Sequence, residues 1–236
     1  MKFRTTAVIL ASLSLSAVCP ARETVQYRQF ADSSGYLSTI FRGPEAHKYN
    51  FAYNGTPFWF SPEYLKGDLR YNGKTYHDVT MNVDAYNGDL LLRPEGSITS
   101  VVAVREFVEW FTLSGKQFVN LKDDSSGLPD GYYWKVCSTG DCVFYCRVFK
   151  TRDTDISVNS DMIGYRDPNI RGYIHEYFKY NRTCWLVRGS GKAVQIRTKG
   201  ALLKEFKQRK AELKKFVVPS LTDTAEAIFK YLNDNE

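Results

Sequence analysis

Residues 67–93 have the sequence GDLRYNGKTYHDVTMNVDAYNGDLLLR, which carries the clearest structural signal in the chain. Asn72-Gly73 and Asn87-Gly88 each separate segments rich in β-branched, aromatic and aliphatic residues. Asn-Gly suits tight hairpin turns because both residues tolerate a positive φ. This stretch is therefore expected to form antiparallel strands. The expected strands are 67–71, 75–83 and 89–93.

Turn residues separate further β-rich segments over most of the chain. The expected pairs are 49–53 and 57–60 around Asn54-Gly55, 108–113 and 117–121 around Ser114-Gly115-Lys116, 132–137 and 142–149 around 138–141, and 184–188 and 193–197 around 189–191. Residues 98–104 and 173–180 are expected to be single strands. Residues 151–172, rich in Asp, Asn, Arg and Gly, are expected to form a long exposed loop.

The hydrophobic spacing changes to a helical period after residue 198. It predicts one helix over 199–216 and a second from near Asp223, with Glu226 as its capping partner. The expected fold class is α+β and mainly antiparallel β. Residues 22–121 are expected to form a hairpin-rich β sandwich or barrel-like part. Residues 122–236 are expected to supply further hairpins and two helices, either as a second domain or packed as one unit with the first.

The first 21 residues have the pattern of a secretory signal peptide. Lys2 and Arg4 supply a basic start, residues 7–18 an apolar stretch, and Cys19-Pro20-Ala21 the small residues of a cleavage site after Ala21. The alternatives are a membrane anchor or a buried N-terminal strand, and lipidation at Cys19, although Val18 replaces the small residue usual there. The mature chain has no run of 18 apolar residues, so no transmembrane helix is expected in it.

Export makes disulfides the expected state of the four remaining cysteines. The spacing favours Cys137–Cys142, opposed across a hairpin, together with Cys146–Cys184. Cys142 and Cys146 would stand about 13 Å apart along one strand, so they are not expected to bridge each other. Cys142–Cys184 is the alternative pairing. Buried thiols are the alternative to any disulfide. A zinc site is not expected, since C-x4-C-x3-C lacks the C-x2-C pairs of structural zinc sites.

Composition and motifs argue against several classes of protein. Hydrophobic residues make up 43% of the chain and aromatic residues 15%, which excludes disorder, collagen and coiled coil. The excess of 32 basic over 26 acidic residues falls from six to four without Lys2 and Arg4, which together with export argues against nucleic acid. The three histidines stand far apart, and Gly189-Ser190-Gly191-Lys192 lacks the remaining residues of a phosphate loop. No metal, cofactor or catalytic residue is predicted.

Two aromatic clusters and one basic helix are the candidate binding surfaces. The clusters are 57–60 and 132–134, and because strand residues alternate between faces, part of each cluster is expected in the core. Trp59, Tyr133 and Trp134 are the candidates for contact with a partner or glycan. The expected helix 199–216 carries seven basic and two acidic residues, which predicts either a solvated face or peripheral contact with an anionic membrane.

Several short blocks of the chain resemble a family of uncharacterised exported proteins of Bacteroidetes. The blocks are NGTPFW (54–59), GDLRYNGKTY (67–76), 89–93, FTL (111–113), GYY (131–133) and KGALL (199–203). They are structural blocks, and no catalytic residue comes with the resemblance. The resemblance implies the periplasm or cell surface of a Gram-negative bacterium.

Together these observations predict a non-catalytic exported protein of the cell envelope. Its expected partner is another envelope protein or a glycan. The alternative is an exported hydrolase whose site is assembled from loops such as 151–172. That alternative requires a pocket that brings His77 or His175 together with carboxylates.

Overall fold

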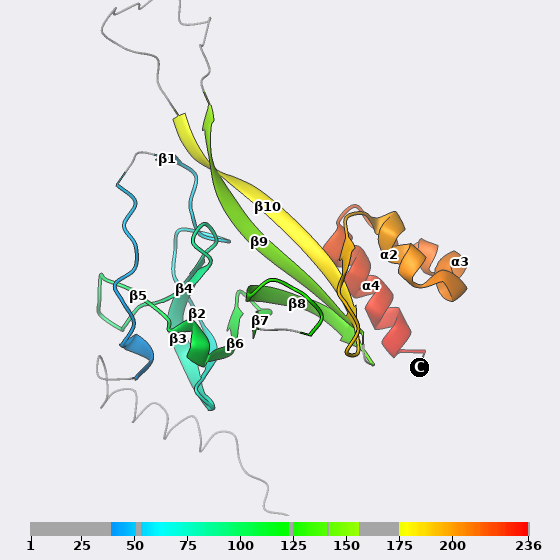
Figure 1. The fold of residues 1–236 in the computed structure, drawn as a ribbon, viewed down its shortest axis with the longest axis horizontal. Helices are drawn as coiled ribbons and strands as arrows, with labels where there is room; N and C mark the ends of the chain where they lie inside the picture. Colours follow the sequence, from blue (N-terminus) through cyan, green and yellow to red (C-terminus); the bar gives the residue numbers. More distant parts are fainter. Residues whose placement is uncertain (1–38, 51–52, 123–124, 141, 156–174, 236) are drawn as a thin grey trace, which may run out of the picture.

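The computed structural model describes residues 39–50, 53–122, 125–140, 142–155 and 175–235 (Figure 1). Eleven strands in these ranges form one sheet in the order β1-β10-β9-β8-β7-β6-β2-β3-β4-β5, with β11 also paired to β10. The strands are β1 Tyr53–Asn54, β2 Leu65–Tyr71, β3 Lys74–Asp84, β4 Asp89–Leu92, β5 Val101–Val102, β6 Val108–Leu113, β7 Lys116–Leu121, β8 Gly131–Thr139, β9 Cys142–Asp155, β10 His175–Arg188 and β11 Val194–Ile196. The α+β, mainly antiparallel class is confirmed, and the sheet is open, not closed into a barrel or split into a sandwich.

The hairpins of 67–93 are confirmed. Asn72 and Gly73 have φ of 48° and 75° between β2 and β3, and Asp84 pairs with Asp89 across the β3–β4 turn. The hairpin expected around Asn54-Gly55 is wrong, because β1 pairs in parallel with β10 instead of with residues 57–60. A partner distant in the sequence therefore overrides the local turn signal there.

The longest strands, β9 and β10, pair from end to end and form a ribbon that extends beyond the other strands (Figure 1). Residues 151–155 continue β9, so the loop predicted there is wrong for these five residues, and the rest of that prediction, 156–172, lies outside the described residues. Cys146 and Cys184 face each other in this ribbon and form the predicted disulfide.

The predicted Cys137–Cys142 disulfide is wrong. A register shift between Lys135 and Cys137 places Cys137 opposite Phe144, while Cys142 lies opposite Thr139. Both cysteines therefore carry thiols. Burial is the main cause that raises the pKa of the Cys137 thiol, followed by the charge of Glu226.

The C-terminal helices pack on the sheet. They are α2 Lys199–Glu205, α3 Lys210–Leu213 and α4 Leu221–Asn233, with 3-10 turns η5 Lys207–Arg209 and η6 Lys214–Phe216. The single helix predicted over 199–216 is wrong, because the backbone leaves the helical region at Phe206 (φ −108°, ψ 52°). Ser220 caps α4 by accepting from the backbone N of Asp223, so the expected Asp223–Glu226 capping pair is wrong as well.

One large core joins the sheet to these helices. Phe144 of β9 lies beside Phe229 of α4, with ring centroids 6.4 Å apart, and both side chains are almost fully buried. The predicted domain boundary at 121/122 follows β7, whose Phe118 pairs with Trp134 of β8. Backbone pairing therefore continues across that boundary.

Candidate functional site

A shallow hollow that opens to solvent lies where the β3–β4 turn meets β9. The pairing of β8 with β9 ends at Trp134 and Cys146, so β9 has an unpaired edge on that side beyond Cys146. The β3–β4 turn lies beside this edge of β9. The backbone N of Lys150 donates to the carbonyl of Ala85 at 2.8 Å. We call this site the β3–β9 hollow; its lining residues are Val83, Ala85, Tyr86, Asn87, Gly88, Tyr132, Arg147, Val148 and Phe149.

The buried carboxylate of Asp84 fixes the turn beside the hollow. Its Oδ1 accepts from the backbone N of Tyr86 and of Asn87, each at 3.0 Å. Its Oδ2 accepts from Tyr49 Oη at 2.5 Å and from Asn87 Nδ2 at 3.2 Å. Burial, followed by the hydrogen bond to Asp84, raises the pKa of Tyr49, so this phenol remains a donor. The network makes Asp84 a structural anchor, because four donors surround a carboxylate that is only 2% exposed.

Arg105 holds the other side of the turn. It donates to the carbonyl of Gly88 at 2.6 Å, and its Cζ lies 5.1 Å from the centroid of the Tyr132 ring. Arg105 thus links the β3–β4 turn to β8 beneath the hollow.

Asp89 lies directly opposite Asp84 in the β3–β4 pair. Burial and then the charge of Asp84 raise the pKa of Asp89, while the charge of Arg105 acts in the opposite direction. The folded state therefore holds a proton on Asp89 more readily than the unfolded chain does. At pH values above its folded pKa, ionised Asp89 reduces the stability of the protein.

We expect Asp89→Asn to raise the free energy of unfolding at pH 7 by up to about 1 kcal/mol, because it removes a like charge opposite Asp84. The gain should vanish as the pH falls to the ordinary Asp pKa of 3.8. Urea unfolding at both pH values measures it, with the exposed Glu95→Gln as the control. A loss of stability at pH 7 would show that the Arg105 attraction dominates.

Arg147 is among the residues that line the hollow, and its guanidinium lies above Gly131. A Cβ at Gly131 would lie 3.1 Å from Arg147 Cζ, and Arg147 Cζ is 5.8 Å from the centroid of the Tyr133 ring. No hydrogen bond or ion pair joins this guanidinium to any residue in the described ranges. The lining contains no Asp, Glu, His, Ser or Cys, so it offers binding groups and lacks a nucleophile or an acid–base pair.

The aromatic residues predicted for binding are engaged in packing. Tyr133 is 0% exposed in a small cluster with Leu128 and Val187, and its hydroxyl donates to the carbonyl of Pro129 at 2.6 Å. Trp134 is 8% exposed in the main core on the opposite face of β8. Trp59 is half-buried and meets the Phe118 ring edge-on at a centroid distance of 4.2 Å.

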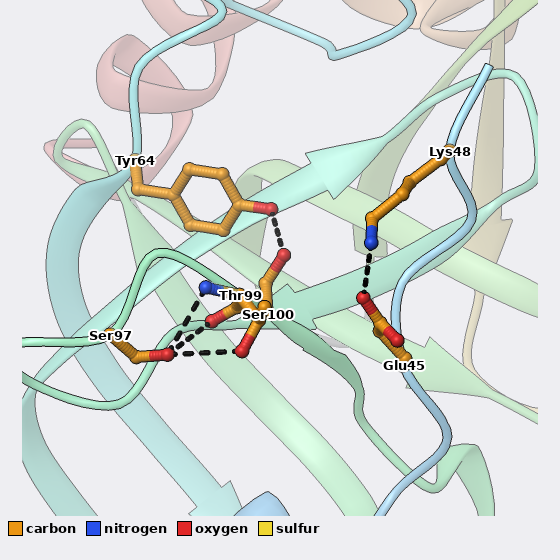
Figure 2. Close-up of polar contacts among 6 residues, drawn as sticks. All are labelled: Glu45, Lys48, Tyr64, Ser97, Thr99 and Ser100. Atoms are coloured by element: carbon orange, nitrogen blue, oxygen red, sulfur yellow. Dashed lines mark hydrogen bonds and ion pairs between the residues drawn. The ribbon is translucent and has the colours of Figure 1, made fainter. Parts of the chain in front are cut away.

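The remaining polar groups tie segments of the fold together. His77 Nδ1 lies 2.9 Å from Asp68 Oδ1 on the β2–β3 hairpin, and the side chain of His175 is outside the described part of the chain. Figure 2 shows a second group near β5, where the hydroxyls of Tyr64 and Ser100 are 2.7 Å apart. In the same view Ser97 bonds to Thr99 and Lys48 pairs with Glu45. These contacts fix the turns around β5.

A second candidate surface lies on the C-terminal helices, where α2 and α3 extend to the outer side of α4 (Figure 1). We call four residues the lysine stripe: Lys204, Lys207, Lys210 and Lys214. They follow one another at intervals of three or four residues. Three of them are exposed and Lys210 is partly buried, and none forms a salt bridge with an acidic residue in the described ranges. Val217 and Val218 follow the stripe and are 37% and 38% exposed.

Sequence patterns gave weak signals for both surfaces. Arg147 is the one charge in the otherwise apolar and aromatic run 143–149, and such an isolated charge is the feature that marks it. The basic character of 199–216 can be read from the sequence, but the sequence does not show which lysines lack acidic partners.

None of the helices in the described ranges is long and apolar enough to cross a bilayer. No family model, no curated protein and no solved structure matches the chain.

Proposed function

We propose that this chain is a non-catalytic exported protein of the cell envelope that binds an anionic membrane surface through the lysine stripe. The N-terminal signal pattern supports export, and the Cys146–Cys184 disulfide is of the kind that persists in oxidising compartments. The resemblance of its blocks to exported Bacteroidetes proteins supports the periplasm or cell surface of a Gram-negative bacterium.

The lysine stripe is the observation that carries the proposal. Other basic groups of 199–216 are already engaged: Lys199 Nζ donates to the carbonyl of Val218 at 3.0 Å, and Arg209 pairs with Glu212 at 3.1 Å. The stripe keeps its charge for an external partner. Each lysine close to an anionic lipid surface contributes about 1 kcal/mol. The exposed Val217 and Val218 add apolar area at the end of the segment.

Co-sedimentation of residues 22–236 with vesicles tests this proposal. Vesicles that contain phosphatidylglycerol are expected to bind the protein, and phosphatidylcholine vesicles to bind it far more weakly. Lys204→Gln/Lys207→Gln should weaken binding about 30-fold, because two lysines contribute about 2 kcal/mol. Lys66→Gln/Lys74→Gln removes the same charge from exposed positions of β2 and β3 and is the matched control. Equal losses in the two variants, or equal binding to both vesicles, would contradict the proposal.

The alternative function, an exported hydrolase, requires a nucleophile or paired carboxylates in a cleft. The lining of the β3–β9 hollow supplies neither. Asp84, the nearest buried carboxylate, already accepts hydrogen bonds from the turn it holds. A binding role is therefore the function that we propose.

A further inference from the structure

The outer edge of β10, on the side away from β9, has a gap in its strand pairing. Glu176 and Tyr177 pair there with β1, and residues 184–186 pair there with β11. Between these two short strands, residues 178–183 pair with β9 and with no other strand in the described ranges. At about 3.3 Å per residue, this interval is roughly 20 Å long. We call residues 178–183 the β10 notch.

The backbone of the β10 notch directs hydrogen-bonding groups outward. The backbone N of Lys150 donates to the carbonyl of Ala85, on the side of β9 away from β10. Opposed residues of an antiparallel pair either bond to each other or both face away. Tyr180 lies opposite Lys150, so its N–H and C=O point to the outer edge, and by alternation those of Arg182 do the same. In the described ranges no backbone group bonds to these four, so another strand can pair with them.

The length of the β10 notch restricts what can fill it. β1 and β11 already occupy the neighbouring strand position at its two ends. The β10 of a second copy, His175–Arg188, is longer than the notch and would overlap both strands. A short extended segment of about five residues fits, provided that its chain leaves the sheet at each end. This geometry is that of strand addition, in which backbone hydrogen bonds hold a peptide on a sheet edge.

The charges around the β10 notch favour an acidic segment. Among the described side chains of β9 and β10, the acidic ones are Asp153 and Glu176, and each is paired with a basic group. Arg182 lies in the notch, and Arg197 borders it because it directly follows β11. Both arginines are exposed, and neither forms an ion pair in the described ranges. Since opposite charges on facing strands attract, carboxylates on the added segment would be stabilised here.

We infer that the β10 notch binds an extended acidic segment of a partner protein by strand addition. The backbone of the segment bonds to the N–H and C=O groups of Tyr180 and Arg182, and its carboxylates lie near Arg182 and Arg197. The Tyr180 side chain, 51% exposed, adds apolar contact. The notch and the lysine stripe share no residue, so this inference does not rest on membrane binding.

Amide hydrogen exchange followed by NMR on residues 22–236 tests the inference. The probes are a hexapeptide of alternating valine and glutamate and its counterpart with lysine in place of glutamate. In the free protein the amides of Tyr180 and Arg182 should exchange rapidly, and those of Lys179 and Asn181, which face β9, slowly. The glutamate peptide should slow exchange at Tyr180 and Arg182 about tenfold or more. It should also bind about tenfold more tightly than the lysine peptide, which places like charges together.

Modified peptides and two variants sharpen the test. N-methylation of every second residue removes the N–H groups from one edge of the glutamate peptide. One of the two methylation patterns should abolish binding and the other preserve it, because only one edge meets β10. Arg182→Gln should weaken binding about threefold. Lys192→Gln, which removes a charge from the exposed turn before β11, is the matched control and should leave binding unchanged.

Four outcomes would overturn the inference. They are equal effects of the two methylation patterns, equal affinity for the two peptides, binding without added protection at Tyr180 and Arg182, and no binding of the glutamate peptide. Equal losses for Arg182→Gln and Lys192→Gln would likewise contradict the acidic preference. Thermal unfolding of both variants confirms that they are folded.

Discussion

Removing the Cys146–Cys184 disulfide is expected to lower the free energy of unfolding by about 4 kcal/mol. The bond joins residues 38 positions apart, so it restricts the unfolded chain strongly, and a loop of this length corresponds to that value in the chain-entropy model. Cys146 and Cys184 are 0% and 3% exposed, so their sulfur atoms also fill core volume.

Urea unfolding of Cys146→Ala/Cys184→Ala against the parent measures this effect, and Cys137→Ala is the control that removes a thiol without breaking a cross-link. The denatured, unreduced residues 22–236 should contain two reactive thiols, from Cys137 and Cys142. Four thiols, or a stability that reductant leaves unchanged, would show that the disulfide does not form.

Phe229→Ala is expected to lower the free energy of unfolding by about 3–5 kcal/mol, which is the usual range for a fully buried Phe. Phe229 of α4 is 1% exposed and lies beside Phe144 of the sheet and Phe206, whose ring centroid is 5.9 Å away. The substitution leaves a cavity at the junction of α4 with β9. The loss should therefore appear in the unfolding of the whole protein.

The exposed Lys230→Ala on the same helix is the control, and its effect should stay within about 0.5 kcal/mol. Circular dichroism in the helical and aromatic regions follows both variants during urea unfolding. A Phe229→Ala loss below 1 kcal/mol, or a helical signal that melts separately from the aromatic signal, would mean that α4 is not part of the main core.

The features predicted correctly from sequence are those that depend on neighbours in the chain. The Asn72-Gly73 turn and the β6–β7 hairpin each join segments only a few residues apart. The Asn54-Gly55 prediction failed because Tyr53 pairs with Glu176, a residue that no local pattern points to. The Cys137–Cys142 prediction failed because the irregularity at Val136 moves the register by one residue.

The candidate site was hidden from sequence for a related reason. The β3–β9 hollow combines the turn after β3, the start of β8 and the middle of β9, which meet only through the order of the strands. Alternation predicted that part of the 132–134 cluster lies in the core. The structure instead buries Tyr133 on one face of β8 and Trp134 on the other.

Membrane binding by the lysine stripe is most directly tested by a lysine acetylation footprint. Residues 22–236 are treated with an amine-reactive reagent, with and without phosphatidylglycerol vesicles, and each lysine is quantified by mass spectrometry. Lys204, Lys207, Lys210 and Lys214 are expected to lose most of their reactivity on the vesicles, while the exposed Lys66 and Lys74 keep theirs. Uniform protection of all lysines, or protection of Lys66 and Lys74 alone, would contradict the proposed membrane contact.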